Sequence, residues 1–454
     1  MMLDTIVKSQ KEYYNSDLTK DISFRKNSLE KLLESIRENE QAIYTALKQD
    51  LNKSETEAYL TEVSIVTAEI RNAIKKLDSW SGTKKVKTPF TLFPASSLIV
   101  KEPYGVVLIM SPWNYPFQLA MAPLIGAIAA GNCAVVKTSK SSPYTSGVIV
   151  DIINSTFEKR YIYAIEEALP YDEVLNQPYD YMFFTGSERV GKSVMRSAAD
   201  RLIPVTLELG GKSPCIIDKY VNVDLAAKKI IWGKTINAGQ TCVAPDYVVV
   251  HKDVKEELID KMKKYIKELV GDPFANEYYP RIINLHHYMR LKNLITKESD
   301  VIGGRYDDKL LRIEPTIFPN ATFDSMIMKD EIFGPILPII EYEDVNELVP
   351  ILKSRPKPLA CYIFSTSRSF VRYMMYNLPF GGGCVNDVIV HLANVQLPFG
   401  GVGNSGMGRY HGKASFDTFT HEKSVLKNMS GMDMALRYPP YDKEKLKMLR
   451  SILK

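Results

Sequence analysis

The chain has few cysteines, and none of them is arranged to bind a metal. Five cysteines occur among 454 residues, an odd number, and they are widely spaced. They are Cys133, Cys215, Cys242, Cys361 and Cys384. No CxxC pair occurs, and neither the cysteines nor the six histidines have metal-ligand spacing; His286 and His287 are expected at the surface. The pattern predicts reduced thiols of a cytoplasmic protein and no metal site.

Neither sign of charge is in large excess. Lys and Arg number 58 against 53 Asp and Glu, which gives a net charge of +5. So small and dispersed an excess does not argue for a nucleic-acid partner. The N-terminus lacks a basic start followed by a long apolar core, so we expect no signal peptide. The length suffices for two or three domains with sizeable cores.

One long stretch, from residue 105 to 136, has no charged residue and could be mistaken for a membrane span. Prolines and polar residues interrupt it, at Pro112, Asn114, Gln118, Pro123 and Asn132. We therefore predict a buried strand at 105–110, a polar loop, a helix at 119–130 and a second strand at 134–137.

The segment 442–454 predicts a basic amphipathic helix. Such a helix could touch a membrane surface, but more often packs on its own protein, which is the interpretation we favour. No apolar tail follows, so no membrane anchor is expected.

Strands and helices alternate along most of the chain. The first eighty residues predict helices at 24–50 and 54–80, and short strands follow at 97–100 and 106–110. Further strands are expected at 161–165, 181–184, 214–217, 247–251, 337–341 and 360–364, and helices at 141–153, 189–199, 225–237, 254–269 and 345–353. The alternation predicts βαβ units and parallel sheets, with a boundary between two α/β domains near 204–211.

Two segments carry the chemistry. Residues 237–245 read Asn-Ala-Gly-Gln-Thr-Cys-Val-Ala-Pro and present Cys242 in an uncharged loop, while Glu208 lies between Leu207 and Leu209. A thiol that attacks a carbonyl and a partly desolvated glutamate that activates water are the two halves of covalent acyl chemistry. Taken alone, Cys242 could be an inert buried cysteine and Glu208 a strand-end partner in a salt bridge.

These two segments resemble the active site of aldehyde dehydrogenases, and further family motifs follow in the family's order. They are Ser-Pro-Trp-Asn-Tyr-Pro-Phe at 111–117, Thr-Gly-Ser-Glu-Arg-Val-Gly at 185–191, Glu-Ile-Phe-Gly-Pro at 331–335 and Leu-Pro-Phe-Gly-Gly at 397–401. The residues at 214–215, 242–247 and 406–413, together with the short N-terminus, resemble those of class 3 aldehyde dehydrogenases. Several motifs in register, from residue 106 to about 421, make the resemblance specific.

The resemblance implies a role for each catalytic candidate. Cys242 would add to the aldehyde carbon, and the Asn114 side-chain amide with the Cys242 backbone N–H would stabilise the oxyanion. Glu208 would activate the water that hydrolyses the thioester. Asn114 could instead only shape a turn before Pro116.

The resemblance also implies NAD or NADP as the cofactor. Its binding residues would be Trp113, Lys137, Lys140, Gly186, Ser187, Gly191, Glu331 and Phe333. Glu188 and Arg189 stand where the family has small or threonine residues, and a carboxylate fits poorly beside a phosphate. Lys140 stands where the family commonly has a glutamate that holds the ribose; a lysine would attract a 2′-phosphate, so we predict that NADP is accepted. The alternative for Lys140 is a solvated surface lysine.

The implied fold is α/β and aldehyde dehydrogenase-like, with two doubly wound domains and a small bridging β oligomerisation element. The NAD(P)-binding domain would take 1–80 and 103–207, the catalytic domain 208–405, and the bridging element 81–102 and 412–440. A homodimer is implied, and Tyr115, Trp232 and Phe399 are candidates for an apolar aldehyde funnel.

Two other functions are weighed. The presence of Glu208 argues against a coenzyme A-acylating enzyme, which does not need this base. The presence of Cys242, Glu208 and Asn114 argues against a non-catalytic binding protein on the same scaffold. The GxGxxG match at 401–406 is rejected because no strand precedes it, and the P-loop-like ending at 211–213 because its first glycine would fall at Thr206. The sequence leaves aliphatic and aromatic aldehydes open.

Overall fold

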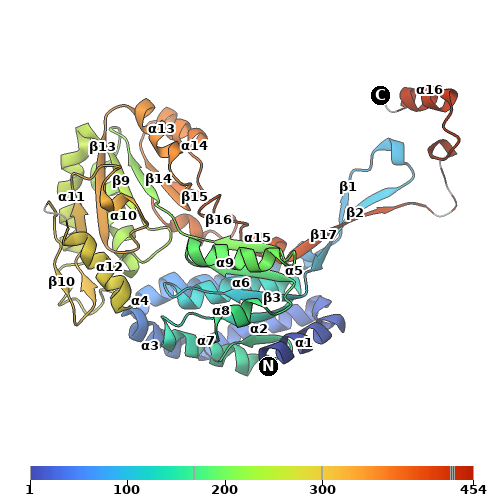
Figure 1. Ribbon diagram of the computed structural model, residues 1–454, viewed down its shortest axis with the longest axis horizontal. Coiled ribbons are helices and arrows are strands. Elements are labelled where there is room, and N and C mark those ends of the chain that lie inside the picture. Colours follow the sequence, from blue (N-terminus) through green and yellow to red (C-terminus); the bar gives the residue numbers. More distant parts are fainter. Residues whose placement is uncertain are drawn as a thin grey trace.

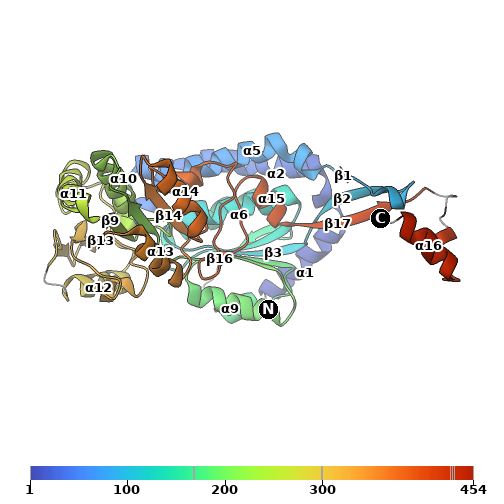
Figure 2. The same ribbon diagram turned by 90° about the horizontal axis from the view of Figure 1, so that it is seen from above.

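The computed structural model describes residues 2–166, 169–297, 300–429, 431, 433 and 435–452. Two six-stranded sheets lie at the centre of two α/β layers, and a three-stranded antiparallel sheet extends away from both as an arm (Figures 1 and 2). The predicted α/β fold with parallel sheets and a small additional β element is confirmed.

The first sheet has the strand order β16-β7-β6-β3-β4-β5. These strands are β16 (Gly406–Met407), β7 (Val205–Glu208), β6 (Tyr181–Thr185), β3 (Val106–Met110), β4 (Cys133–Lys137) and β5 (Ile162–Ala164). All neighbours are parallel except β16, which pairs antiparallel with β7 and places Gly406 opposite Glu208. Figure 2 shows α6 (Pro116–Ala130) on one side of this sheet and α9 (Glu188–Ala199) on the other.

The uncharged run forms β3, a loop, α6 and β4, as predicted, and every residue of these three elements is buried. The helix α6 begins at Pro116, three residues before the expected start, because a proline is well suited to the first helical turn. In the described part of the chain, no helix combines the length and the apolar character that crossing a bilayer requires.

The second sheet has the order β12-β13-β9-β8-β14-β15, and all its neighbours are parallel. Its strands are β12 (Thr316–Phe318), β13 (Ile336–Tyr342), β9 (Tyr247–His251), β8 (Pro214–Ile217), β14 (Ala360–Phe364) and β15 (Gly382–Val385). The helices around it are α10 (Val223–Thr235), α11 (Lys255–Leu269), α12 (Leu285–Ile295), α13 (Val345–Ser354) and α14 (Arg368–Asn377), and a hairpin of β10 (Tyr306–Asp307) and β11 (Arg312–Ile313) lies at its margin. The chain crosses from one sheet to the other between Glu208 and Pro214.

The arm consists of β1 (Lys84–Val86), β2 (Ser96–Pro103) and β17 (Thr420–Lys427), and the last two pair along their full lengths. The helix α16 (Lys443–Ile452) lies near the tip of the arm (Figure 1). A C-terminal helix is confirmed over these residues, while 453 and 454 lie outside the described residues. Leu449 and Ile452 line a groove with Leu92 and Phe93, but α16 buries none of its described side chains. The expected packing on the protein is therefore limited to this groove.

The N-terminal helices differ from the prediction in two places. The expected helix at 24–50 is two helices, α2 (Ile22–Glu38) and α3 (Glu40–Leu51), because the Asn39 side chain donates to the carbonyl of Ser35 and competes with the helical pattern. The segment 54–80 is α4 (Glu55–Ala58), a π-helical turn (Tyr59–Val63) and α5 (Ser64–Ser81) in succession. Single π-helical turns inside helices often occur at functional sites.

Candidate active site

Cys242 follows a tight turn whose backbone is strained. Asn237 and Ala238 both have φ of 50°, and a Cβ on Gly239 would lie 2.4 Å from the Gly334 carbonyl oxygen. The residues on either side of Cys242 are held by hydrogen bonds, since Thr241 Oγ1 lies 2.6 Å from Tyr115 Oη and Tyr362 donates to the Val243 carbonyl. Strain of this kind persists where surrounding contacts fix the backbone, as at active sites.

The Cys242 thiol is protonated near neutral pH in this state. Burial raises its pKa to about 12, and the nearby carboxyl groups of Glu331 and Glu208 act in the same direction. A thiolate is the reactive form, so the thiol needs a positive charge beside it or loss of its proton during attack.

Glu208 is the last residue of β7, and its side chain is buried. Within the described residues, neither carboxyl oxygen has a hydrogen-bond partner. Burial raises the pKa of this carboxyl well above its ordinary value, which favours the neutral acid. A buried polar group without a partner indicates that a water or ligand atom is needed beside it.

Asn114 is buried and lies on the loop between β3 and α6. Its backbone carbonyl accepts hydrogen bonds from Lys53 and from the Asn237 side chain. Asn114, Glu208 and Cys242 all line one cavity of about 320 Å³. The structure therefore brings the three candidates for catalysis together from two sheets.

Five of the eight predicted cofactor residues line the same cavity: Trp113, Gly186, Ser187, Glu331 and Phe333. Phe333 contacts Trp113 edge-on, with ring centroids 5.3 Å apart. Gly186 and Ser187 form the turn between β6 and α9, where backbone amides at a helix start suit an anion.

The other three predicted cofactor residues lie outside this cavity. Gly191 lets α9 pack closely, because a Cβ there would lie 2.7 Å from the Leu209 side chain. Lys137 ends β4, is buried, and its ammonium lies 4.5 Å from the centroid of the Tyr171 ring. Burial and the charge of Lys140 lower the pKa of Lys137, while Lys140 itself is exposed.

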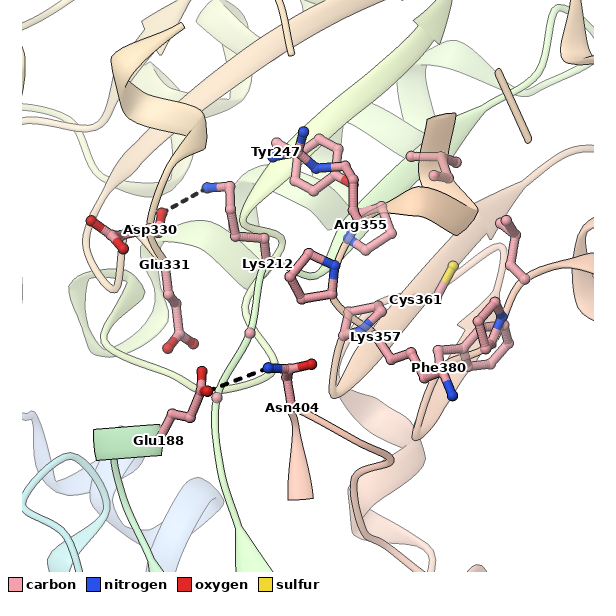
Figure 3. A pocket seen from close by; sticks show the side chains of 18 of the residues that line it. Glu188, Lys212, Tyr247, Asp330, Glu331, Arg355, Lys357, Cys361, Phe380 and Asn404 are labelled. Atoms are coloured by element: carbon pink, nitrogen blue, oxygen red, sulfur yellow. Dashed lines mark hydrogen bonds between the residues drawn. The ribbon is translucent and has the colours of Figure 1, made fainter. Parts of the chain in front are cut away.

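The carboxyl groups of Glu188 and Glu331 border a second cavity, of about 260 Å³, which Figure 3 shows together with Lys212. Glu188 pairs with Lys192 at 2.5 Å and accepts from Asn404 at 3.3 Å. Glu331 lies across Gly210, where a Cβ would come within 2.1 Å of its Oε2 atom. Burial raises the pKa of Glu331 to about 8.

The sequence did not identify two residues of α12 that line the 320 Å³ cavity, His287 and Arg290. The expectation of a surface position is correct for His286 and wrong for His287, which is half-buried with its ring 4.8 Å from the Trp113 ring. Burial lowers the pKa of His287 to about 4, so its ring is neutral. Arg290 donates to the backbone carbonyl of Ile332. The three-residue spacing that puts both on one helix face was a signal available in the sequence.

The 320 Å³ cavity fits a nicotinamide nucleotide. Within the described residues, three side chains on its wall have buried polar atoms without partners: Thr185, Glu208 and His287. Flat aromatic walls at Trp113 and Phe333 stand beside these polar atoms, which is the combination that small-molecule cofactor sites present. Among the residues that the structure describes, no group of His, Cys, Asp or Glu side chains is arranged to hold a metal ion.

A third cavity, of about 210 Å³, is apolar and is also lined by Cys242. The three funnel candidates Tyr115, Trp232 and Phe399 all line it. Its other walls are mainly aliphatic and aromatic, from residues that include Leu60, Ile65, Ile236, Val243, Ile389 and Tyr410. The thiol is therefore accessible from a polar cavity and from an apolar one.

The chain matches the model of the aldehyde dehydrogenase family over residues 3–425. It is 49% identical to the 4,4′-diaponeurosporen-aldehyde dehydrogenase of Staphylococcus aureus, over 98% of this chain and 97% of that protein. It is 41% identical to a dimeric NADP-preferring aldehyde dehydrogenase of Rattus norvegicus, over 96% of this chain and 97% of that protein. A solved structure described as the substrate-bound state of Staphylococcus aureus AldH has a TM-score of 0.97 at 48% identity, and the match covers 100% of this chain and 99% of that one.

Class 3 aldehyde dehydrogenases predominate among the matched relatives. They include family 3 proteins from Dictyostelium discoideum and Arabidopsis thaliana, at 42% and 41% identity. The matched family comprises enzymes that oxidise aldehydes to carboxylic acids with NAD(P). With these matches over nearly its whole length, the chain belongs to the aldehyde dehydrogenase family and resembles its class 3 members.

Proposed function

We propose that this enzyme oxidises apolar aldehydes through a covalent intermediate on Cys242, with Asn114 and Glu208 as its catalytic partners. One observation carries the proposal: a thiol, a carboxamide and a carboxyl meet at one cavity, and the carboxyl oxygens have no hydrogen-bond partner among the described residues. The apolar cavity that Cys242 also lines suits an aliphatic or aromatic aldehyde and disfavours a charged one.

In the first step the Cys242 sulfur bonds to the aldehyde carbon, the carbonyl double bond opens, and the thiol proton leaves to solvent. The carbonyl oxygen becomes negative and accepts hydrogen bonds from the Asn114 side chain and the Cys242 backbone N–H. A nicotinamide cofactor held by Trp113 and Phe333 would supply a positive charge near the thiol and the acceptor for the hydride that this carbon loses when its double bond to oxygen re-forms, which leaves a thioester on Cys242.

In the second step the thioester on Cys242 is hydrolysed. Glu208, once ionised, takes a proton from a water whose oxygen attacks the thioester carbon. The carbon–sulfur bond breaks, the sulfur regains a proton, and the carboxylic acid leaves. Because burial raises the pKa of Glu208, water beside its oxygens, which have no partner among the described residues, would favour the ionised form that acts as the base.

The test measures reduced cofactor with an aldehyde panel in the absence of coenzyme A. We expect steady turnover for the wild type and loss of turnover in Cys242→Ser. A coenzyme A-acylating enzyme would need coenzyme A for turnover, and a non-catalytic protein would produce no reduced cofactor under any condition.

We also propose that NADP is accepted, because a lysine at position 140 would attract a 2′-phosphate. Lys140 is exposed, and its charge adds to the burial that lowers the pKa of Lys137. Lys140→Glu should lower kcat/KM for NADP relative to NAD by about tenfold, which corresponds to the loss of one favourable charge contact of about 1.4 kcal/mol. An unchanged ratio of the two values would show that Lys140 does not contact the cofactor.

We further propose that the cofactor domain comprises 1–80 and 103–207, the catalytic domain 208–405 and a bridging element 81–102 and 412–440.

The arm exposes the side chains of Phe90, Phe93 and Leu426, at 85%, 65% and 52% of their surface, and a second copy of the chain would cover them in a homodimer. The scarce cysteines support a cytoplasmic location. Sedimentation equilibrium should give the mass of two chains, and Phe90→Glu with Phe93→Glu should shift it toward one.

A further inference from the structure

A buried ion pair lies beneath the proposed oxyanion site. Lys53 Nζ lies 2.6 Å from Glu62 Oε1, and both side chains have no exposed surface. Lys53 follows α3, and Glu62 belongs to the π-helical turn Tyr59–Val63. Leu60 and Thr61 of the same turn line the apolar cavity, so this turn faces the aldehyde with one side and the ion pair with the other.

The pair holds the backbone of the Asn114 loop at three points. Lys53 Nζ donates to the Asn114 carbonyl at 3.2 Å and lies 4.0 Å from the centroid of the Tyr115 ring. The second oxygen of Glu62 accepts from the backbone N–H groups of Phe117 and Gln118, at 2.9 and 3.1 Å. These N–H groups belong to the first turn of α6, where a negative charge is favourable.

The same Asn114 carbonyl is also tied to the nucleophile loop. Asn237 Nδ2 donates to it at 2.8 Å and to the Gln240 carbonyl at 3.0 Å. The Asn237 backbone N–H donates to Glu57 Oε1 at 2.7 Å, one turn of chain before Glu62. One oxygen atom, on Asn114, therefore joins the loop that carries the carboxamide to the loop that carries the thiol.

We propose that the Lys53–Glu62 ion pair is a positioning device that sets the Asn114 carboxamide relative to Cys242. A buried ion pair is weak evidence for stability, because apolar side chains of similar volume often serve as well. Its distinctive consequence here is geometric, since both partners bind the backbone of one catalytic loop. The inference rests on the proposed role of Asn114 as an oxyanion donor.

The test is a mutant cycle with the paired variant Lys53→Met/Glu62→Gln. The double substitution removes both charges together and keeps a side-chain oxygen at position 62 that can accept hydrogen bonds from the α6 amides. It is made in the wild-type chain and in Asn114→Ala. The control is Lys255→Met/Glu341→Gln, the same two substitutions in a partly exposed ion pair between α11 and β13 whose residues line neither active-site cavity. Thermal unfolding checks that each variant is folded at the assay temperature.

We expect Asn114→Ala to lower kcat by about 10²- to 10³-fold, as loss of an oxyanion donor does. The paired variant should lower kcat by about 10- to 100-fold with little change in aldehyde KM, because the carboxamide is displaced while the apolar cavity remains. In the Asn114→Ala background the paired variant should lower kcat by no more than about twofold. The control variant should change kcat by no more than about twofold in either background.

Equal effects of the paired variant in both backgrounds would overturn the inference, since the pair would then act without Asn114. A small effect of Asn114→Ala alone would refute the proposed role of Asn114 and the inference with it. If the paired variant does not fold, Lys53→Gln/Glu62→Gln enters the same cycle, because it also removes both charges and keeps a polar side chain at each position.

Discussion

Replacing Glu208 by glutamine separates the two chemical steps. The amide has the shape of the carboxylic acid but cannot accept a proton, so it leaves attack by Cys242 intact and removes the base for hydrolysis. Loss of a general base slows a step by about 10²- to 10⁴-fold. In rapid mixing with aldehyde and cofactor, we therefore expect a burst of about one reduced cofactor per active site, followed by turnover slower by that factor.

The same substitution should stabilise the fold near neutral pH. The pKa of Glu208 is raised in the folded state, so the folded chain holds a proton that the unfolded chain releases above about pH 4.3. Stability is therefore lost as pH rises, by about 1.4 kcal/mol for each unit by which the pKa is raised. Glutamine does not titrate, and because neither oxygen of the acid has a partner among the described residues, no hydrogen bond is removed.

Chemical unfolding of both proteins at pH 4.5 and pH 7.5 measures this difference. Glu208→Gln should gain stability relative to the wild type at the higher pH and little at the lower one. A variant that is less stable at pH 7.5, or that turns over at the wild-type rate, would refute the assignment of Glu208 as a neutral buried acid that serves as the base.

Two further predictions concern Cys242 and Glu331. Because the pKa of Cys242 is about 12 in this state, its alkylation by iodoacetamide without cofactor should become about tenfold faster for each pH unit between 7 and 9. The alkylation rate of Cys242→Ser gives the background from the other cysteines. A plateau in this pH range would show that the thiolate is already formed. A methyl group at Gly210 would collide with the Glu331 carboxylate, so Gly210→Ala should raise the KM of the cofactor at least about tenfold while thermal stability stays near that of the wild type; an unchanged KM would argue that Glu331 does not contact the cofactor.

The sequence predicted those parts of the fold that depend on local pattern. The run from 105 to 136 shows strand, helix and strand in the structure because apolar residues that are buried on all sides need no charged face. The break at Asn39 depends on a single side-chain hydrogen bond that competes with a good helical pattern, and periodicity is insensitive to it. The motif residues Asn114, Glu208 and Cys242 could be proposed from resemblance, but their meeting at one cavity depends on how the two sheets are placed.

The spacing of His287 and Arg290 indicated a shared helix face, but the contacts of His287 with Trp113 and of Lys53 with Asn114 could not be predicted from the sequence. Each joins segments far apart in the chain, His287 with Trp113 and Lys53 with Asn114. A histidine or a lysine in a charged helical region is usually solvated, so composition favours the surface. Only the packing of α12 and of the N-terminal helices against the loop before α6 makes these side chains part of the site.

Burial acts in the same direction on the two reactive groups, because it raises the pKa of both. It keeps the Cys242 thiol and the Glu208 acid neutral, so neither reacts while the site is dry. In the mechanism proposed above, the apolar cavity admits the aldehyde to the thiol, whereas the polar cavity offers to an incoming water the Glu208 oxygens, which have no partner among the described residues. Attack and hydrolysis are thus separated by which cavity is filled, because the environment of each group sets its protonation state.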